Sequence, residues 1–334
     1  MKFRMMKWAA AVAGLSLPFM HAYAGATPSG AFPDKPIRWI VPFPPGGSND
    51  VLARFVAAKL TDRLNEQVVI DNRGGANGII GAELAASQSP DGYTLLMVST
   101  SFVMNAAVRS LPYDVEKSFD PIATIGSSPN SLVVTAGSRF ESLRDLVESA
   151  KAVPGSINYA STGVGGFNHF GGELFKKIAG IDLVHIPYRG GGPAMTDVMS
   201  GQVPVMFSSL TQVMPNVRSG RLKLLAVGSR ARSPVVPDVP TVAEAGFPGY
   251  EVSVWWGVVA PAGVAPAPLE KLRREIAAVI ADPQTQKHLT TDAAEPLLMS
   301  PAELRRMISA DVVRWTAVAR SAGIRVPSSR TAAR

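Results

Sequence analysis

The sequence predicts a mixed α/β fold with largely parallel sheets. Short β-rich runs alternate with helical patterns along most of the chain, which is the order that parallel sheets require. Glycine-rich turns follow a predicted strand and precede a predicted helix three times, at Gly46, at residues 163–166 and at residues 190–192. Two further β-rich runs, residues 119–134 and 250–260, exceed the usual strand length of about five or six residues. These long runs favour two domains joined by two crossing segments.

The pattern of the amino-terminal residues is typical of an export signal. Basic residues within positions 2–7 precede an apolar run at positions 8–20, which is too short to span a bilayer. Small residues ending at Ala24 allow cleavage before Gly25. The sequence therefore predicts a signal peptide at residues 1–24.

The amino-acid composition excludes several kinds of site and function. Cysteine is absent from all 334 residues, which excludes disulfides, cysteine-ligated metal, a cysteine nucleophile and a lipid-modified N-terminal cysteine. An exported chain without a lipid anchor is best retained behind an outer membrane, so we expect it in the periplasm. Removing the three basic residues of the signal from the formal net charge of +7 leaves +4, and the cations are scattered, which argues against nucleic-acid binding.

The stretch at residues 36–65 is the clearest strand–turn–helix unit. Two prolines after Phe43 force an extended path, and the glycines at 46–47 allow backbone conformations closed to residues with a Cβ atom. Ser48 or Asn49 can cap the helix that follows. The apolar residues of this helix recur at three- or four-residue spacing, at Leu52, Phe55, Val56, Leu60 and Leu64. Two interpretations stay open: an ordinary turn, or a helix amino end that attracts an anion.

The next units continue the alternation. Residues 67–71 are a predicted strand, and the glycine-rich residues 72–78 lead into a helix through Ala86. The glycines here lack the GxGxxG spacing, so a nucleotide site is not favoured. A strand at residues 93–98 places Ser101 near its carboxyl end, which is the edge where ligands sit in open α/β sheets.

The rest of the chain repeats the pattern and ends in helices. Further predicted strands are residues 157–160, 183–187, 203–207 and 222–227, and predicted helices are residues 142–153, 167–178, 213–218 and a segment from Ala194, with Pro193 at the first helical position. Two amphipathic helices follow, around residues 269–280 and from the capping box at Ser300 to Gly323.

Backbone chemistry at the turns predicts a carboxylate site. If the helix amino ends after the glycine-rich turns face one cleft, their free N–H groups converge on a small volume. Hydrogen bonds to a charged group contribute about 1.5–3 kcal/mol each, so three or four could support about micromolar affinity without an arginine. The scarcity of charged residues in these turns agrees with such a site.

For several individual residues the sequence allows both a structural role and a ligand-binding role. His169 either hydrogen-bonds the start of its helix or faces a ligand, and Asp50 either complements its helix dipole or accepts from a ligand. Residues 255–256 are tryptophans that either pack at a hinge or stack on a ligand. An enzyme is not favoured, because His169, His185 and His288 lack metal-ligand spacing and neither a GxSxG elbow nor a Walker A loop occurs.

Several motifs resemble one family of binding proteins. They are Lys35–Arg38, Val41–Asp50, Asn72–Ala76, Pro90–Leu96, Tyr159–Gly163 with His169, Pro187–Gly190, Val239–Thr241 and Trp256–Gly257 with Ala260–Pro261. On these residues the chain resembles the Bug family, the extracytoplasmic substrate-binding proteins of tripartite tricarboxylate transporters. The resemblance covers residues 36–323.

The resemblance implies a two-lobed periplasmic binding protein of type II, a Venus flytrap with a hinge of two crossing strands. Domain 1 would comprise residues 32–128 and 252–327, and domain 2 residues 129–251. Residues 43–50 and 161–166 would hold a carboxylate through backbone amides, hydroxyls and ordered waters. The predicted ligand-binding residues are Phe43, Pro45, Gly46, Gly47, Ser48, Asp50, Ser101, Ser161, Thr162, Gly163, Gly166, His169 and Ser208.

The same resemblance implies the partners. The protein would be a monomer without metal or cofactor that delivers an aromatic, di- or tricarboxylic acid to membrane permease subunits. Many members carry an Asp where this chain has Ser208 and Ser209, so an amino-acid ligand is less favoured than a plain or aromatic acid. A sensor that presents its ligand to a signalling partner stays an alternative, as does an enzyme on the same bilobal fold, such as porphobilinogen deaminase, although that enzyme tethers its cofactor through a cysteine.

Overall fold

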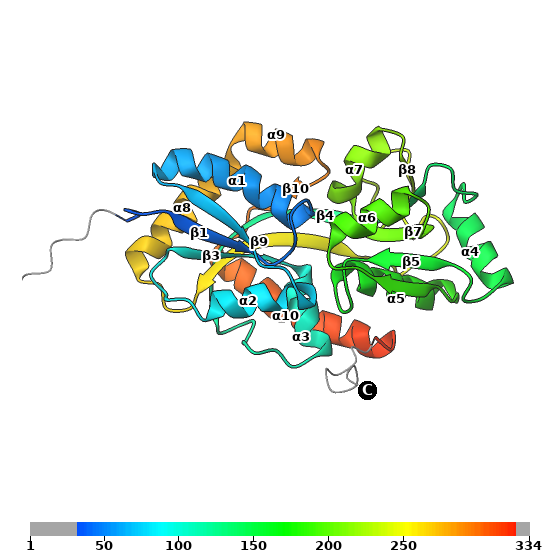
Figure 1. The fold of residues 1–334 in the computed structure, drawn as a ribbon, viewed down its shortest axis with the longest axis horizontal. Helices are drawn as coiled ribbons and strands as arrows, with labels where there is room; N and C mark the ends of the chain where they lie inside the picture. Colours follow the sequence, from blue (N-terminus) through cyan, green and yellow to red (C-terminus); the bar gives the residue numbers. More distant parts are fainter. Residues whose placement is uncertain (1–31, 325–334) are drawn as a thin grey trace, which may run out of the picture. The chain divides into compact units, whose positions relative to one another are not determined.

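Ten strands form one hydrogen-bonded sheet in the computed structural model, which describes residues 32–324 (Figure 1). The predicted signal peptide at residues 1–24 lies outside these described residues. The main path of the sheet runs β2-β1-β3-β9-β4-β7-β5-β6, with β8 and β10 each paired to β4. The strands are β1 (Ile37–Val41), β2 (Val68–Asn72), β3 (Thr94–Ser99), β4 (Phe119–Thr135), β5 (Asn158–Ser161), β6 (Val184–Pro187), β7 (Val205–Ser209), β8 (Leu222–Val227), β9 (Ser253–Pro261) and β10 (Glu295–Pro296).

The long strand β4 connects two parallel sets of strands. Strands β1, β2 and β3 are parallel to one another, and so are β5, β6 and β7. Up to Pro129, β4 pairs antiparallel with β9, and from Asn130 onward it pairs antiparallel with β7 and β8. We call the strands on the first side of this change half-sheet A (β1–β3, β9, β10 and the start of β4) and those on the second side half-sheet B (β5–β8 and the end of β4).

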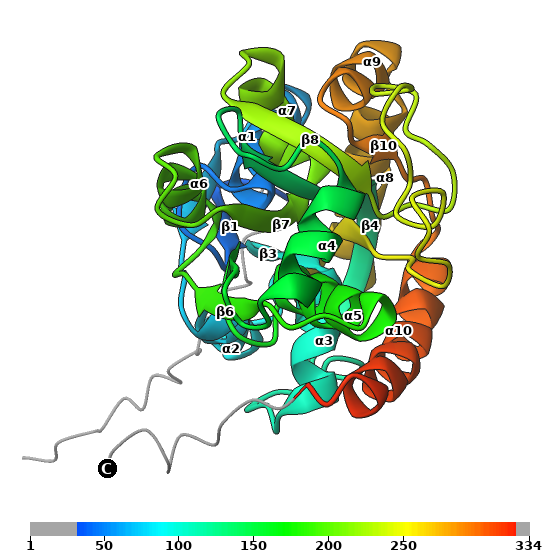
Figure 2. The same cartoon turned by 90° about the vertical axis from the view of Figure 1, so that its right-hand side faces the viewer.

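Helices cover both faces of each half-sheet (Figures 1 and 2). On half-sheet A, α1 (Ser48–Leu64) packs on α8 (Pro266–Ala281), and α3 (Thr100–Val108) packs on α10 (Pro301–Ser321) at the opposite face. On half-sheet B, α6 (Gly191–Met199) and α7 (Leu210–Arg218) share a buried core with β7, whereas α5 (Phe167–Ala179) packs on its other face. The remaining helices are η1 (Ala76–Gly78), α2 (Ile79–Ala86), α4 (Leu143–Ala152) and α9 (Pro283–Thr291).

Apolar periodicity explains helix α1. In α1 the side chains of Leu52, Val56 and Leu60 are buried, as the three- and four-residue spacing predicts. The helix ends at Asn65, which adopts the left-handed conformation that asparagine tolerates. Among the described residues no helix is both long and apolar enough to span a bilayer.

Some boundaries differ from the sequence-based prediction. Helix α3 was not predicted, because six of its nine residues are buried and it therefore shows no polar face. Helices α6 and α7 begin three residues before the predicted starts, so Pro193 occupies the third helical position instead of the first. Helix α9 and the two-residue strand β10 were also not predicted. Short helices that follow a strand directly leave too little periodic sequence to locate their first turn.

A capping box fixes the start of α10. The Ser300 hydroxyl accepts from the Glu303 backbone N–H (3.3 Å), and the Glu303 carboxylate accepts from the Ser300 backbone N–H (2.8 Å). The carboxyl-terminal helix thus starts at the residue where the sequence places it. Because α10 packs on α3, this cap also helps to hold α10 against half-sheet A.

We expect Ser300→Ala to destabilise the protein by about 1 kcal/mol, because the substitution removes a helix cap. Thermal unfolding should show a fall in Tm of about 2–4 °C. Ser309→Ala is the matched control, since the Ser309 hydroxyl donates only to the Arg305 carbonyl within the same helix. Equal melting temperatures for Ser300→Ala and the unmodified protein would contradict this assignment.

Candidate functional site

The amino ends of five helices meet at one small cavity. Helices α1, α3, α5, α6 and α7 each follow a parallel strand, and each contributes at least one lining residue. The space open to the centres of water molecules is about 40 Å³, room for about three waters and comparable with a carboxylate group. The lining residues are Phe43, Pro44, Gly47, Ser48, Asn49, Ser99, Ser101, Thr162, Phe167, Asn168, Gly191, Ser209, Gln212 and Val254.

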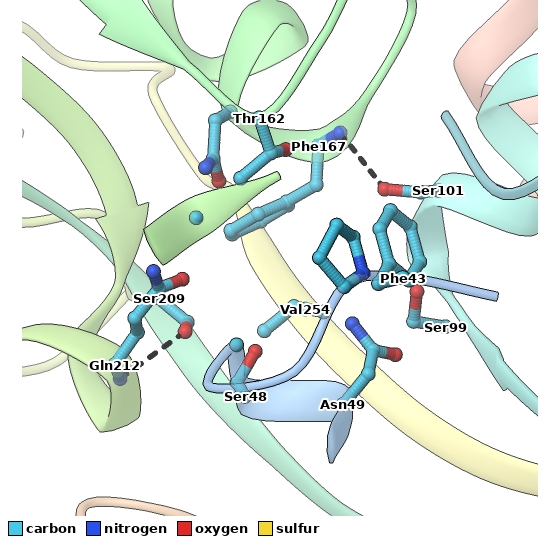
Figure 3. A pocket seen from close by; sticks show the side chains of 14 residues that line it. Phe43, Ser48, Asn49, Ser99, Ser101, Thr162, Phe167, Ser209, Gln212 and Val254 are labelled. Atoms are coloured by element: carbon cyan, nitrogen blue, oxygen red, sulfur yellow. Dashed lines mark hydrogen bonds between the residues drawn. The ribbon is translucent and has the colours of Figure 1, made fainter. Parts of the chain in front are cut away.

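The lining combines hydroxyl, amide and apolar groups. In Figure 3, Ser48 and Asn49 lie across the cavity from Thr162 and Phe167, with Phe43 and Val254 between them. None of the described residues that line this cavity is charged. Its electrostatic character therefore comes from backbone and side-chain dipoles.

Four of the five helices begin without a side-chain cap from their own N-cap residue. These N-cap residues are Gly47, Ser99, Gly166 and Gly190, whereas Ser209 caps α7 by accepting from the Gln212 backbone N–H (3.4 Å). Two first-turn N–H groups donate to serine hydroxyls from other elements, Phe167 to Ser101 (3.1 Å) and Thr211 to Ser128 (3.2 Å). The first-turn N–H groups left without a partner and the positive ends of the helix dipoles favour a negative group. The cavity is therefore suited to an anion.

A buried carboxylate supports the turn between β1 and α1 from behind. Asp50 accepts from the Gly46 backbone N–H (2.9 Å), from Arg54 Nε (3.0 Å) and from Asn72 Nδ2 (2.8 Å). Burial raises the pKa of this carboxyl, but these hydrogen bonds outweigh burial and hold the pKa below its usual value. Gly46 itself has φ +84°, a conformation that favours glycine. Asp50 thus fixes the turn and lies outside the cavity lining.

Two stacked histidines support the turn between β5 and α5. His169 Nδ1 accepts from the Gly165 backbone N–H (3.2 Å), and its ring stacks on His185 with centroids 4.2 Å apart. The Ser161 hydroxyl accepts from the Gly163 backbone N–H (3.1 Å) and lies 2.6 Å from His185 Nε2. Burial lowers the pKa of His169 to about 4 and that of His185 to about 3, so both rings are neutral at pH 7.

The structure brings five of the thirteen predicted ligand-binding residues to the cavity: Phe43, Gly47, Ser48, Ser101 and Thr162. Pro45 and Gly163 line a neighbouring groove instead. The others, Gly46, Asp50, Ser161, Gly166, His169 and Ser208, do not line the cavity. Ser208 donates to Gln212 Oε1 (3.2 Å) and so orients a residue that does line it.

Nine of the fourteen lining residues were not among the thirteen predicted ligand-binding residues. Ser99, Ser209 and Gln212 stand at helix starts, so the rule that selected Ser48 could have found them once α3 and α7 were placed correctly. Val254 comes from a crossing strand, and only the tertiary structure brings it to the cavity. Phe167, Asn168 and Gly191 were also not predicted, whereas Pro44 and Asn49 fall within the predicted binding turn at residues 43–50 but were not among the individual residues named.

A metal site does not explain this arrangement. Within residues 32–324 no group of three or more histidine, aspartate or glutamate side chains could hold a metal ion. His169, His185 and Asp50 are instead engaged with the turns that surround the cavity.

Residues 52–324 match the model of the tripartite tricarboxylate transporter family receptor. The chain belongs to this family. It is 37% identical over 298 residues to BugT of Bordetella pertussis strain Tohama I, covering 88% of this chain and 91% of that protein.

Solved structures agree with the family membership. The periplasmic binding protein BugD superimposes with a TM-score of 0.85 at 33% identity, covering 88% of this chain and 99% of that structure. An R. palustris protein solved with adipate gives a TM-score of 0.86, also at 33% identity and with the same coverage. The α/β periplasmic-binding-protein fold predicted from the sequence is thus confirmed, and this receptor is a solute-binding protein and not an enzyme.

His169, which is buried, and His185, which is half-buried, make the stability of this receptor pH-dependent. Their pKa values are depressed in the folded state, so the unfolded chain binds more protons than the folded chain below about pH 6.5. The free energy of unfolding is therefore highest above about pH 6.5 and decreases as the pH falls towards 4. We expect His169→Asn, which offers another acceptor to the Gly165 N–H, to reduce the fall in Tm between pH 7 and pH 4.5 by several degrees.

The matched control is His288→Asn, because the His288 side chain is 45% exposed. Melting curves at four or five pH values give the slope of Tm against pH for each variant. This slope separates a titration effect from a loss of stability that is the same at every pH. A slope for His169→Asn equal to that of His288→Asn would contradict the assignment.

Proposed function

We propose that this receptor captures a small carboxylate in the cavity and delivers it to the membrane permease subunits of a tripartite tricarboxylate transporter. The observation that carries the proposal is the convergence of five helix amino ends on one uncharged cavity. Hydrogen bonds to a charged group contribute about 1.5–3 kcal/mol each. Three or four of them offset the cost of ordering the ligand and support about micromolar affinity.

We further propose that binding closes two domains, residues 32–128 with 252–327 and residues 129–251. Two features support this division: β4 changes pairing partners between Pro129 and Asn130, and the cavity takes lining residues from both half-sheets. A ligand that contacts both domains stabilises the closed state by its differential contacts. A permease could then distinguish the loaded receptor from the empty one.

We also propose two kinds of role for the predicted ligand-binding residues. Phe43, Gly47, Ser48, Ser101 and Thr162 would meet the carboxylate directly, since they line the cavity. Asp50 and His169 would act by holding the two turns in place. The receptor would work as a monomer in the periplasm after removal of residues 1–24, with no cofactor.

Cavity chemistry favours an acid without an ammonium group. An α-ammonium needs a carboxylate partner, and none of the described lining residues is acidic. The positive ends of five helices would also repel it. We therefore propose plain or aromatic carboxylic acids as ligands in preference to amino acids.

A sensor that presents its ligand to a signalling partner is the second candidate, because ligand capture would have the same structural basis. Neighbouring genes that encode a permease support delivery, whereas a neighbouring kinase gene supports sensing.

A thermal-shift panel tests the binding function. We expect adipate, malate or benzoate to raise the Tm of the receptor lacking residues 1–24, while aspartate and glutamate raise it less. A ligand at 100 times its Kd adds about 2.7 kcal/mol of stability, equivalent to about 5–10 °C. A panel in which every organic acid leaves the Tm unchanged would contradict the proposal, and tight binding of aspartate alone would contradict the proposed ligand class.

A side chain added at Gly47, a glycine that lines the cavity, provides a second test of the binding site. A Cβ atom at Gly47 would meet only the Pro44 carbonyl oxygen, at 3.9 Å, so Gly47→Val adds methyl groups without a clash at Cβ. We expect this variant to keep its Tm within about 2 °C and to lose ligand affinity at least 100-fold in isothermal titration.

Gly137→Val is the matched control for this test, since Gly137 is exposed and nothing lies within 4 Å of its added Cβ. Unchanged affinity in Gly47→Val would place the ligand elsewhere.

A further inference from the structure

A large groove lies beside the cavity and shares a wall with it. The groove has a volume of about 940 Å³, and Phe43, Pro44 and Thr162 line both spaces. Figure 3, which shows the small cavity, places Phe43 and Thr162 on opposite sides of that cavity. The outer part of the groove includes the exposed residues Gly75 and Arg189, so it is open to solvent. The open groove and the small cavity are therefore neighbours that share part of their lining.

The shared wall contains a close contact at Pro44. A Cβ atom added to Gly190 would lie 3.0 Å from Pro44 Cδ, and one added to Gly74 would lie 2.9 Å from the same atom. The proline ring is therefore packed between two glycines, one following half-sheet A and one following half-sheet B. The contact between Pro44 and Gly190 is a van der Waals contact, which separates at lower cost than a hydrogen bond. Movement of the Gly190 turn away from Pro44 would join the groove to the cavity.

The groove carries only positive charge. Among the described residues that line it, Arg109 and Arg189 are the charged ones. Arg109 is partly buried and donates from Nη2 to the Val164 carbonyl oxygen (2.8 Å), so it joins α3 to the turn before α5. Arg189 is exposed and makes no hydrogen bond or ion pair with another described residue. By contrast, Arg73 near the rim is paired with Asp71 (2.8 Å).

An unpaired cation at the mouth of a groove attracts anions from solution. Charged residues beside a binding site raise the association rate, and this effect weakens as salt screens the charge. A guanidinium about 6 Å from a passing carboxylate in water accounts for about a threefold rate difference. A charge that acts only during approach leaves the dissociation rate unchanged.

We propose that this groove is the entrance through which a carboxylate reaches the cavity, and that Arg189 steers the ligand into it. The entrance rests on the proposed function, since it supplies the cavity described above. It assigns Arg189 a role in approach, distinct from the residues that hold the bound ligand.

The test compares association rates in Arg189→Gln and in a matched control. Arg144→Gln removes the same charge from an exposed position on α4 that does not line the groove. Isothermal titration first identifies which of adipate, malate and benzoate binds. Stopped-flow tryptophan fluorescence then gives kon and koff for that acid between 20 mM and 500 mM NaCl, since Trp255 adjoins the lining residue Val254.

We expect Arg189→Gln to lower kon about threefold at 20 mM NaCl, with the difference disappearing at 500 mM and koff unchanged. Arg189→Glu should lower kon further, and Arg144→Gln should match the unmodified receptor. An unchanged kon, an equal fall in Arg144→Gln, or an effect confined to koff would overturn the entrance. If none of the three acids binds, the proposed function itself fails.

Discussion

The alignment of strand ends with helix starts is the constraint on which this site depends. In a parallel β–α unit the helix begins at the carboxyl edge of the strand, so its free N–H groups project beyond the sheet. Five such units end at one cavity here, from both half-sheets. The positive potential therefore arises from the fold itself, and a charged side chain in the cavity is not required.

Such a backbone site needs turns that hold their shape. Asp50 fixes the turn after β1 through three hydrogen bonds, and the His169–His185 pair with Ser161 fixes the turn after β5. These ionisable groups lie outside the cavity lining, where they position backbone amides. His169 and His185, whose pKa values are lowered by burial, thus support the site without lining it.

The division between a neutral cavity and a cationic groove separates two physical tasks. Unpaired charge inside a closed cavity carries a large desolvation cost, whereas an exposed guanidinium keeps its hydration. Dipoles around the cavity suit a bound anion, and Arg189 at the groove acts at longer range in solvent. The Pro44 contact with Gly190 lies between these two regions.

The sequence by itself determined the α/β class, most strands to within two residues, the α10 capping box and the use of glycine-rich turns after β1, β5 and β6. These features depend on local periodicity and turn chemistry, which nearby residues encode. Only the tertiary structure decided that α3 is a helix, that Val254 and Gln212 face the cavity, and that Asp50 and His169 do not line it. The reason is that a side chain's direction at a helix start, and its neighbours from distant strands, depend on packing between segments far apart in the chain.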